Sequence, residues 1–585
     1  KLSELNPQKL VESVTFLELE KIIASYLKDT VIETENTIDV DSIKEVVRKR
    51  QDMHWANCRL ASSLDIPRTA LFSVYTAIIA AADFFATKIE YNDSLHINDP
   101  EKLFKSYTDK LYRIDQLYRR FCENADNADS SGWGILKDLR DRIEDVYCNW
   151  FLDSLAMSWD NCISAQSWEI QGVSNQYSFF AEYPQKVAGE KSSRGRTTAY
   201  VIVSDALRYE AAEELTRELN GKYRFVAKLE SMLGVVPSYT ALGMAALLPH
   251  KELGFTDKGE VLINKKKCVA PQQRLKVLEE IKGTSIKADQ LLEMKREESR
   301  DFVRDKDIIY IYHNEIDAVG DDALTEKDTF RAVQRTIKKL SDIVSYVINT
   351  LHAKYVYVTA DHGFVFTQTK PNETDKNKIA INKEDVTKAN KRYLLGNDIP
   401  LINDSVAGKV SDTAGVSPEA DMAFVVPKGM SRFYFTGGSR FFHGGMSLQE
   451  VVIPVVVIEQ KRGKAVEQTR ERKVSVQVLG TDHRITTNLH RFQLLQTDAV
   501  SDRIKPLTIK TAVYDGDTPV TDIQNITFNS RSDNMSDRTQ WVSVTLLNRE
   551  YDKNKSYHFV LRDVETNIEV GSVAVKIDRL FSNDF

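Results

Sequence analysis

The middle of this chain alternates apolar, β-branched runs with helical segments, and this alternation restricts the fold more strongly than any other feature. The apolar runs are AYVIVS (199–204), DIIYIYHN (307–314), KYVYVTA (354–360) and VVIPVVVIE (451–459). Residues 205–219 and 330–351, which lie between them, have helical periodicity. Strands that alternate with helices predict a mostly parallel sheet covered on both faces. We therefore expect an α/β domain over residues 199–464.

Two segments with different patterns flank the α/β region. Residues 1–185 place apolar side chains at three- and four-residue steps, which predicts a helical domain. Residues 465–585 contain short alternating runs separated by turn residues, which predicts an antiparallel β-sandwich. The polar stretch 186–198 is typical of a linker. The helical domain is either a docking platform for partners or a segment that packs on its neighbour.

Composition excludes several classes of protein. Hydrophobic residues make up 42% and charged residues 28%, as in ordinary globular proteins, and the net charge of −6 means that any nucleic-acid contact must be local. The five cysteines form no CxxC pair, which argues against a disulfide framework and favours a reducing cytoplasm. The most apolar stretch, residues 69–87, contains Asp83 and predicts a buried helix, so we expect no membrane association.

Acidic side chains and histidines lie next to the predicted strands. They are Asp205 after residues 199–204, Asp317 after 307–314, Asp361 and His362 after 354–360, and His443 before 451–459. A single Asp in such a place is explained as a helix N-cap, but four strand-linked positions are harder to explain in this way. Ligands of α/β folds bind beyond the carboxyl ends of the strands, and carboxylate with imidazole suits zinc or manganese-like ions. The pattern therefore predicts a metal site.

A candidate nucleophile lies in residues 235–250, VVPSYTALGMAALLPH. Thr240 begins a predicted small-residue helix after a proline turn, where backbone N–H groups and the helix dipole favour an anion. A metal-bound hydroxyl at this position would become an attacking alkoxide. The alternative is that Ser238 or Thr240 only caps the helix.

Five motifs occur in the order used by the alkaline phosphatase superfamily. They are DALR (205–208), PSYTALGMAALLP (237–249), DAVGD (317–321), TADHG (359–363) and FFHGG (441–445). Together with the sequence around residues 440–459, they resemble one branch more closely, the PglZ family of the BREX bacteriophage-defence systems. The resemblance covers roughly residues 199–460 and implies an alkaline-phosphatase-like core between the two flanking domains.

The resemblance also implies two divalent metal ions, with zinc expected and manganese or magnesium as alternatives. One ion would be held by Asp205, Thr240, Asp361 and His362, and the other by Asp317, His443 and a third ligand from DAVGD. Related phosphodiesterases carry a histidine where this chain has Asp321, so an oxygen would replace a nitrogen ligand. Asp322 or His313 could contribute instead.

The function implied by the resemblance is hydrolysis of a phosphoric ester, as a phosphodiesterase or nuclease in which Thr240 attacks and forms a phosphothreonine. A phosphomonoesterase or phosphomutase is one alternative, and a catalytically decayed scaffold, suggested by Asp321, is another. Arg208 either clamps the phosphate or pairs with a carboxylate. Expected partners are other BREX components, including a DNA methyltransferase, and a nucleic-acid or nucleotide substrate.

Overall fold

A computed structural model describes most of the chain. It describes residues 17–52, 66–192, 195–222, 225–369, 386–433, 440–460, 472–480, 483–501, 503–516, 518–564 and 568–578, together with Leu10, Trp55, Lys376, Asn377 and Thr566. Contacts divide the chain into two compact units, Lys1–Thr216 with Ala227–Gln460, and Arg217–Val226 with Lys461–Phe585. The domain boundary predicted near residue 185 falls inside the first unit.

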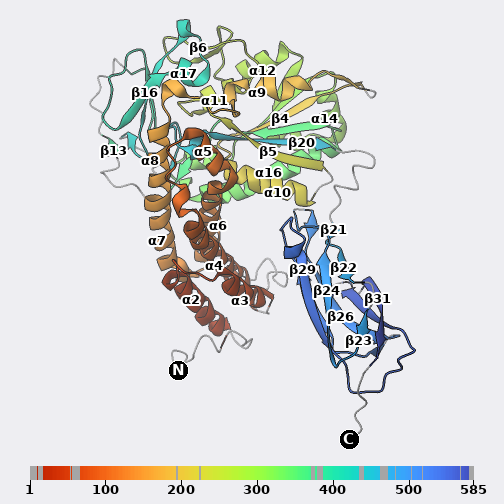
Figure 1. Ribbon diagram of the computed structural model, residues 1–585. Helices are drawn as coiled ribbons and strands as arrows, with labels where there is room; N and C mark the ends of the chain where they lie inside the picture. The colour runs from red at the N-terminus through yellow and green to blue at the C-terminus, as the bar shows by residue number, and fades with distance from the viewer. Residues whose placement is uncertain are drawn as a thin grey trace. The chain divides into compact units, whose positions relative to one another are not determined.

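A seven-stranded sheet forms the centre of the first unit (Figure 1). Its strands, in spatial order, are β1 (Ser174–Asn175), β5 (Phe225–Leu233), β20 (Val452–Gln460), β11 (Tyr355–Thr359), β4 (Ala199–Ser204), β10 (Ile308–His313) and β9 (Gly283–Lys287). β4 runs parallel to β10 and β11, whereas β20 runs antiparallel to β11. The sheet is therefore mixed with mostly parallel strands, which confirms the predicted strand pattern of the α/β region.

Helices cover both faces of this sheet. α10 (Tyr209–Lys222) and α16 (Thr329–Asn349) lie on one face, and α11 (Thr240–Ala246) and α12 (Pro271–Glu279) lie on the other (Figure 1). All six residues of β4 are buried as a result. Because both faces are covered, functional side chains are expected at the ends of the strands.

The N-terminal part of the first unit is helical. Its helices are α2 (Leu17–Glu33), α3 (Val40–Asp52), α4 (Ile66–Tyr91), α5 (Pro100–Ser106), α6 (Tyr112–Ser130), α7 (Lys137–Asp145) and α8 (Asp153–Cys162). One helical stretch, Ala70–Ser94, which includes most of α4, is long and apolar enough to cross a membrane, but 67% of its apolar window is buried inside the protein. Helix α4 is thus a core helix, as its sequence predicted.

Shorter elements complete the first unit. The helices are α9 (Phe179–Glu182), α13 (Ala288–Glu293), α14 (Arg296–Val303), α15 (Ile316–Gly320), α17 (Val410–Ala414) and α18 (Leu448–Val451). The strands are β2 (Lys191–Ser192), β3 (Gly195–Arg196), β6 (Leu253–Phe255), β7 (Val261–Ile263), β8 (Lys266–Lys267), β12 (Val365–Phe366), β13 (Lys376–Asn377), β14 (Lys388–Ala389), β15 (Leu394–Gly396), β16 (Ser405–Lys409), β17 (Ala423–Pro427), β18 (Arg432–Phe433) and β19 (Phe441–Phe442).

The second unit consists mainly of two antiparallel sheets. Its strands are β21 (Arg472–Lys473), β22 (Val476–Leu479), β23 (Arg484–Ile485), β24 (Leu489–Gln496), β25 (Ile504–Lys505), β26 (Leu507–Asp515), β27 (Thr518–Pro519), β28 (Gln524–Phe528), β29 (Thr539–Thr545), β30 (Tyr557–Asp563) and β31 (Glu569–Ile577). Phe492 on β24 stacks on Phe559 on β30 with ring centroids 3.8 Å apart, so the two sheets share one core. This arrangement is consistent with the predicted β-sandwich, although two of its strand pairs are parallel. They are β21 with β25 and β23 with β31.

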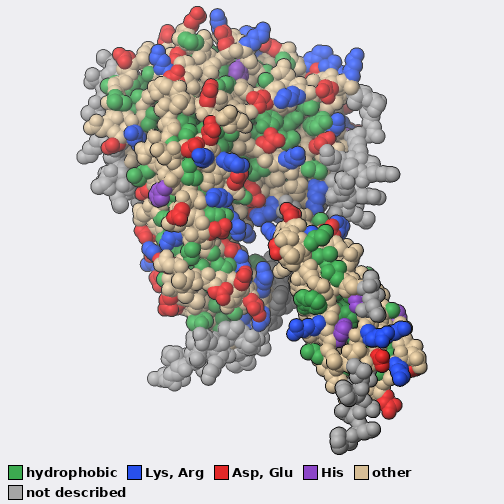
Figure 2. Space-filling model, viewed as in Figure 1, with side chains coloured by type: hydrophobic (Ala, Val, Ile, Leu, Met, Phe, Trp, Pro, Cys, Tyr) green, Lys and Arg blue, Asp and Glu red, His purple; other side chains and the backbone are tan. Residues whose placement is uncertain are grey.

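The surface carries charged side chains of both signs (Figure 2), and the described cysteines are free thiols. On the face shown in Figure 2, acidic and basic side chains are interspersed over the described residues. Cys122, Cys148, Cys162 and Cys268 are free, and Cys58 lies outside the described residues.

Candidate metal centre

Two loops at the carboxyl edge of the sheet bring together the first pair of predicted ligands. Because β4 and β11 are parallel, with Val203 opposite Thr359, Asp205 and Asp361 follow their strands at the same edge. The backbone N–H of Ala206 donates to Asp361 Oδ1 over 3.2 Å, which ties the two loops together. Both carboxylates are almost fully buried.

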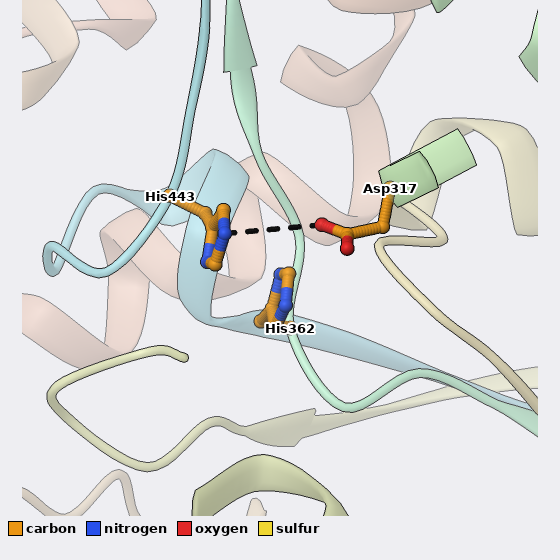
Figure 3. A group of neighbouring side chains, drawn as sticks. All are labelled: Asp317, His362 and His443. Atoms are coloured by element: carbon orange, nitrogen blue, oxygen red, sulfur yellow. Dashed lines mark ion pairs between the residues drawn. The ribbon is translucent and has the colours of Figure 1, made fainter. Parts of the chain in front are cut away.

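His443 reaches the same edge from the opposite chain direction. Since β20 is antiparallel to β11, its first residues lie beside the end of β11, and the loop before β20 lies at the carboxyl edge. Pairing of β12 with β19 holds the segment after His362 against the segment before His443. The two imidazole rings stack with centroids 3.9 Å apart and an interplanar angle of 1° (Figure 3).

Asp317 completes this arrangement from the short helix α15. Its Oδ1 lies 3.8 Å from His443 Nε2, as the dashed line in Figure 3 shows. A Cβ at Gly320 would collide with the ring of Phe441, so glycine at the end of α15 lets the His443 segment approach this helix.

The predicted ligands form two groups that share one residue. Asp205, Asp361 and His362 offer ligand atoms within 4.8 Å of one another, and so do Asp317, His362 and His443. His362 Nε2 lies 3.5 Å from both Asp205 Oδ1 and Asp361 Oδ2. The second group therefore takes His362 as its third member, where the sequence predicted a residue of DAVGD.

Three carboxylate oxygens at this centre lack a hydrogen-bond donor in the part of the chain that the structure describes, as ligands of a cation would. Asp205 Oδ1, Asp361 Oδ2 and Asp317 Oδ1 are buried oxygen atoms that accept no hydrogen bond from any described residue. Buried carboxylate oxygens without a hydrogen bond are costly, and a metal ion in each of the two groups would compensate them. Nitrogen and oxygen donors in this combination suit zinc or manganese better than magnesium, which prefers oxygen alone.

Both histidines present the nitrogen that a metal needs. His362 Nδ1 lies 2.9 Å from the carbonyl oxygen of Gly363, and His443 Nδ1 lies 3.1 Å from that of Ser238. A carbonyl only accepts, so each Nδ1 carries the proton and each neutral ring keeps its Nε2 lone pair. Such a second hydrogen bond is the usual way in which a protein orients a metal-binding imidazole.

Burial is the main cause of the pKa shifts of Asp205 and His443 at this centre. Burial raises the pKa of Asp205 well above its usual value, and the Asp361 and Asp317 carboxylates raise it further. Burial also lowers the pKa of His443, and the neighbouring His362 ring contributes to this effect. The neutral form of His443, which binds metals, is therefore favoured, whereas the clustered carboxylates call for a positive counter-charge.

Thr240 lies beside this centre and does not cap its helix. Its Oγ1 is 3.1 Å from His362 Nε2, and the N-cap residue of α11 is Tyr239, without a side-chain cap. Ser238 has a different role, because its hydroxyl donates to the carbonyl of Gly445 and accepts from the N–H of Gly444. Neither hydroxyl therefore acts as the helix cap that the sequence left open, and Thr240 stays the predicted nucleophile.

Three alternative ligands lie outside both groups. Asp321 and Asp322 are exposed residues that follow α15, and the backbone N–H of Asp321 donates to the carbonyl of Asp317. His313 is buried, and its Nδ1 lies 3.1 Å from Ser204 Oγ. Asp321 is nevertheless close enough to raise the pKa of His443. Its role as a ligand stays a prediction.

Arg208 faces the helical segment. Its Nη2 lies 2.6 Å from Asp115 Oδ1 on α6, and its guanidinium lies over the ring of Phe364. Asp115 also accepts hydrogen bonds from Tyr107 and Tyr147, which come from two π-helical turns. Of the two roles that the sequence left open, the structure contains the carboxylate pair. The guanidinium contacts Asp115 and Phe364 in this way, and the phosphate-clamping role of Arg208 stays a prediction.

This buried pair should be essential for stability. Replacing Asp115 by alanine leaves the Arg208 charge without its partner, and we expect the free energy of unfolding to fall by about 3–5 kcal/mol. Replacing the pair together, by Asp115→Leu with Arg208→Met, should cost less than Asp115→Ala alone, because no buried charge remains. Urea unfolding followed by tryptophan fluorescence measures both effects. Equal losses in the single and double variants would contradict this account.

Several supporting residues escaped the sequence analysis. Buried Gln176 donates to the carbonyls of Ala360 and Asp361 and accepts from the N–H of Val235, so it links the Asp361 loop to the segment before Thr240. Glu450 accepts from Gly445 and pairs with Arg392, which holds the loop that carries His443. The capping-box pattern S-x-x-E at 447–450 was a signal for Glu450, whereas nothing local identifies Gln176.

Comparison with known proteins places this centre in a family. Residues 183–458 match the family described as the BREX system PglZ alkaline phosphatase-like domain. The chain contains a PglZ-family domain. It is 36% identical over 588 residues to the alkaline phosphatase-like protein BrxZ of Escherichia coli O9:H4 (strain HS), and 32% identical over 593 residues to the alkaline phosphatase-like protein PglZ of Bacillus cereus (strain H3081.97). These alignments cover 99% and 98% of the chain, which spans 66% and 65% of the two relatives.

Among solved structures, the chain is similar to mouse ectonucleotide pyrophosphatase/phosphodiesterase 5. The TM-score is 0.31 at 11% sequence identity, and the match covers 45% of this chain and 88% of the mouse protein. A likeness at this level supports no conclusion about function.

Proposed function

We propose that this chain hydrolyses phosphoric esters with the help of divalent metal ions, and that phosphodiesters are its substrates. The observation that carries the proposal is the meeting of three unsatisfied buried carboxylate oxygens with two imidazole Nε2 atoms, beside the Thr240 hydroxyl. An alkaline-phosphatase-like domain over residues 183–458 supports the same reaction class.

The residues at the centre would hold two metal ions. Asp205, Asp361 and His362 would hold one ion, Asp317 and His443 the other, and zinc is the metal that we expect. Such ions neutralise the charge of a phosphoryl group and increase the acidity of a bound hydroxyl. A single imidazole nitrogen coordinates one ion, so the ion beside Asp317 needs a further ligand when His362 serves the first. Asp321, one helical turn from Asp317, is our proposal for it.

Thr240 would supply the nucleophile. Its hydroxyl lies at the start of α11, and Oγ1 is 3.1 Å from His362 Nε2. Attack of Oγ1 on phosphorus would form a Thr–O–P bond and break the bond between phosphorus and one ester oxygen. That oxygen would take up the proton lost from the threonine hydroxyl and leave as the alcohol. Water would then cleave the phosphothreonine and restore the hydroxyl.

The direct test is hydrolysis of bis(p-nitrophenyl) phosphate by the purified protein. We expect turnover that disappears after exhaustive chelation and returns when zinc or manganese is added, because the buried carboxylates need the ions to neutralise them. Absorbance of the released nitrophenolate measures it. Unchanged turnover by a protein shown by mass spectrometry to be free of metal would overturn the proposal.

We further propose that the chain works with other BREX components, including a DNA methyltransferase, in the cytoplasm, and that its substrate is a nucleic acid or nucleotide. The PglZ-family domain supports the link to BREX. The helical segment supplies Asp115 and Gln176 to the core. Its deletion would therefore disturb the metal centre as well as any docking surface.

A further inference from the structure

A pocket of about 720 Å³ adjoins the metal centre and has no role in the steps proposed above. Asp205 forms part of its wall, and α11, α12, α13, α15, α16 and the ends of β9 and β10 supply further lining residues, among them Met244, Arg274, Lys287, Tyr312 and His313. Its volume is in the range of pockets that bind small molecules. A group attached to a phosphoryl held at Asp205 would therefore lie next to it.

Several polar atoms in the wall of this pocket have no partner. His313 Nε2, Tyr312 Oη and Arg274 Nε are buried and form no hydrogen bond with any described residue. The His313 ring is 4% exposed, and its Nε2 lies 3.8 Å from Glu315, beyond hydrogen-bond distance. Tyr312 and Arg274 are donors, so a ligand with oxygen acceptors would satisfy them.

The charges of the wall favour an anion. Asp205, whose charge the proposed metal ion would balance, is one acidic member of the wall, and the other two are paired, since Asp289 pairs with Lys339 at 2.5 Å and Glu315 pairs with Arg335 at 2.6 Å. Within the described part of the chain, Arg274 and Lys287 form no ion pair. The Arg274 guanidinium lies 5.1 Å from the centre of the Tyr312 ring, which holds it at the wall.

We propose that this pocket binds a second phosphate of the substrate, carried by the group on one side of the phosphoryl that reacts. Arg274 and Lys287 supply the charge, and Tyr312 and His313 supply hydrogen bonds. The inference rests on the proposed function and narrows its substrate class to phosphodiesters with a further phosphate, as in a nucleic-acid backbone or a nucleoside bisphosphate. An arginine suits this role because its planar fork donates two parallel bonds to one phosphate.

A matched pair of substrates tests this. The p-nitrophenyl ester of thymidine 5′-phosphate and the same compound with an additional 3′-phosphate differ only in the second anionic group. We expect kcat/KM to be about tenfold or more higher for the second compound, mainly through KM, because the pocket binds a group that does not react. Arg274→Gln or Lys287→Gln should reduce this preference, which is measured as the ratio of the two kcat/KM values obtained with the same variant. Lys276→Gln, an exposed residue of α12 outside the pocket, is the matched control and should keep it.

Calorimetry separates this proposal from the proposed function. Thymidine 3′,5′-bisphosphate should bind the wild-type protein about tenfold more tightly than thymidine 5′-phosphate, and Arg274→Gln should abolish the difference. Binding of this kind without any turnover would support the pocket and contradict the esterase. Equal affinities of the two nucleotides, or a preference that survives Arg274→Gln, would overturn the pocket whether or not the protein is an esterase.

Discussion

Replacement of Thr240 by alanine is expected to reduce phosphodiester hydrolysis by at least about 1000-fold, equivalent to about 4 kcal/mol in the activation barrier. The reason is that Oγ1, which lies 3.1 Å from His362 Nε2, is the only group to which we assign the attack. The helix should be unaffected, because Thr240 does not cap α11. Initial rates with bis(p-nitrophenyl) phosphate at saturating metal measure the effect.

Thr240→Ser is the matched control. It keeps a hydroxyl at the start of α11 and should retain measurable activity, while both variants should still bind metal through the carboxylates and histidines. Mass spectrometry of the protein during turnover should detect a phosphorylated Thr240 in the wild type. A Thr240→Ala variant with a rate within about tenfold of the wild type would mean that water attacks directly, and Thr240 would then be only a neighbour of the metal centre.

Removal of Asp205 or Asp361 should abolish turnover and the binding of the first ion. Each alanine variant loses a buried carboxylate from the group that contains His362, so the affinity for the first ion should collapse. Metal content after dialysis, measured by elemental mass spectrometry, should fall from about two ions to one or none. The thermal stabilisation that added metal gives the wild type should shrink accordingly, since only a bound ligand raises the melting temperature.

Two further carboxylate variants serve as comparisons for this experiment. Asp342→Ala, an exposed residue of α16, should leave metal content and activity unchanged. Asp321→Ala should lose only the ion beside Asp317, if Asp321 completes that site as we propose. Full metal content and activity in Asp205→Ala would instead show that this carboxylate serves the loop after β4 and no ion.

The sheet and most of the candidate ligands could be predicted from short sequence patterns, namely apolar runs followed by an acidic residue. β4 and β11 are strongly apolar runs that end one and two residues before Asp205 and Asp361, and a buried parallel strand has this signature whatever surrounds it. The order of the motifs along the chain is enough to indicate the PglZ family. Local chemistry was sufficient because each of these features depends on residues that are close in sequence.

The sequence by itself determined four of the seven strands of the central sheet, the two helices α10 and α16, and which side chains follow or precede those strands, because periodicity and motifs are local properties. Only the tertiary structure decided the rest. The antiparallel direction of β20 brings His443 to the ligand edge, His362 belongs to both groups, and Arg208 turns to Asp115 on α6. Each of these depends on contacts between residues about 80 or more positions apart. Such contacts are decided by how layers of the fold pack, and a single sequence carries no local signal for that packing.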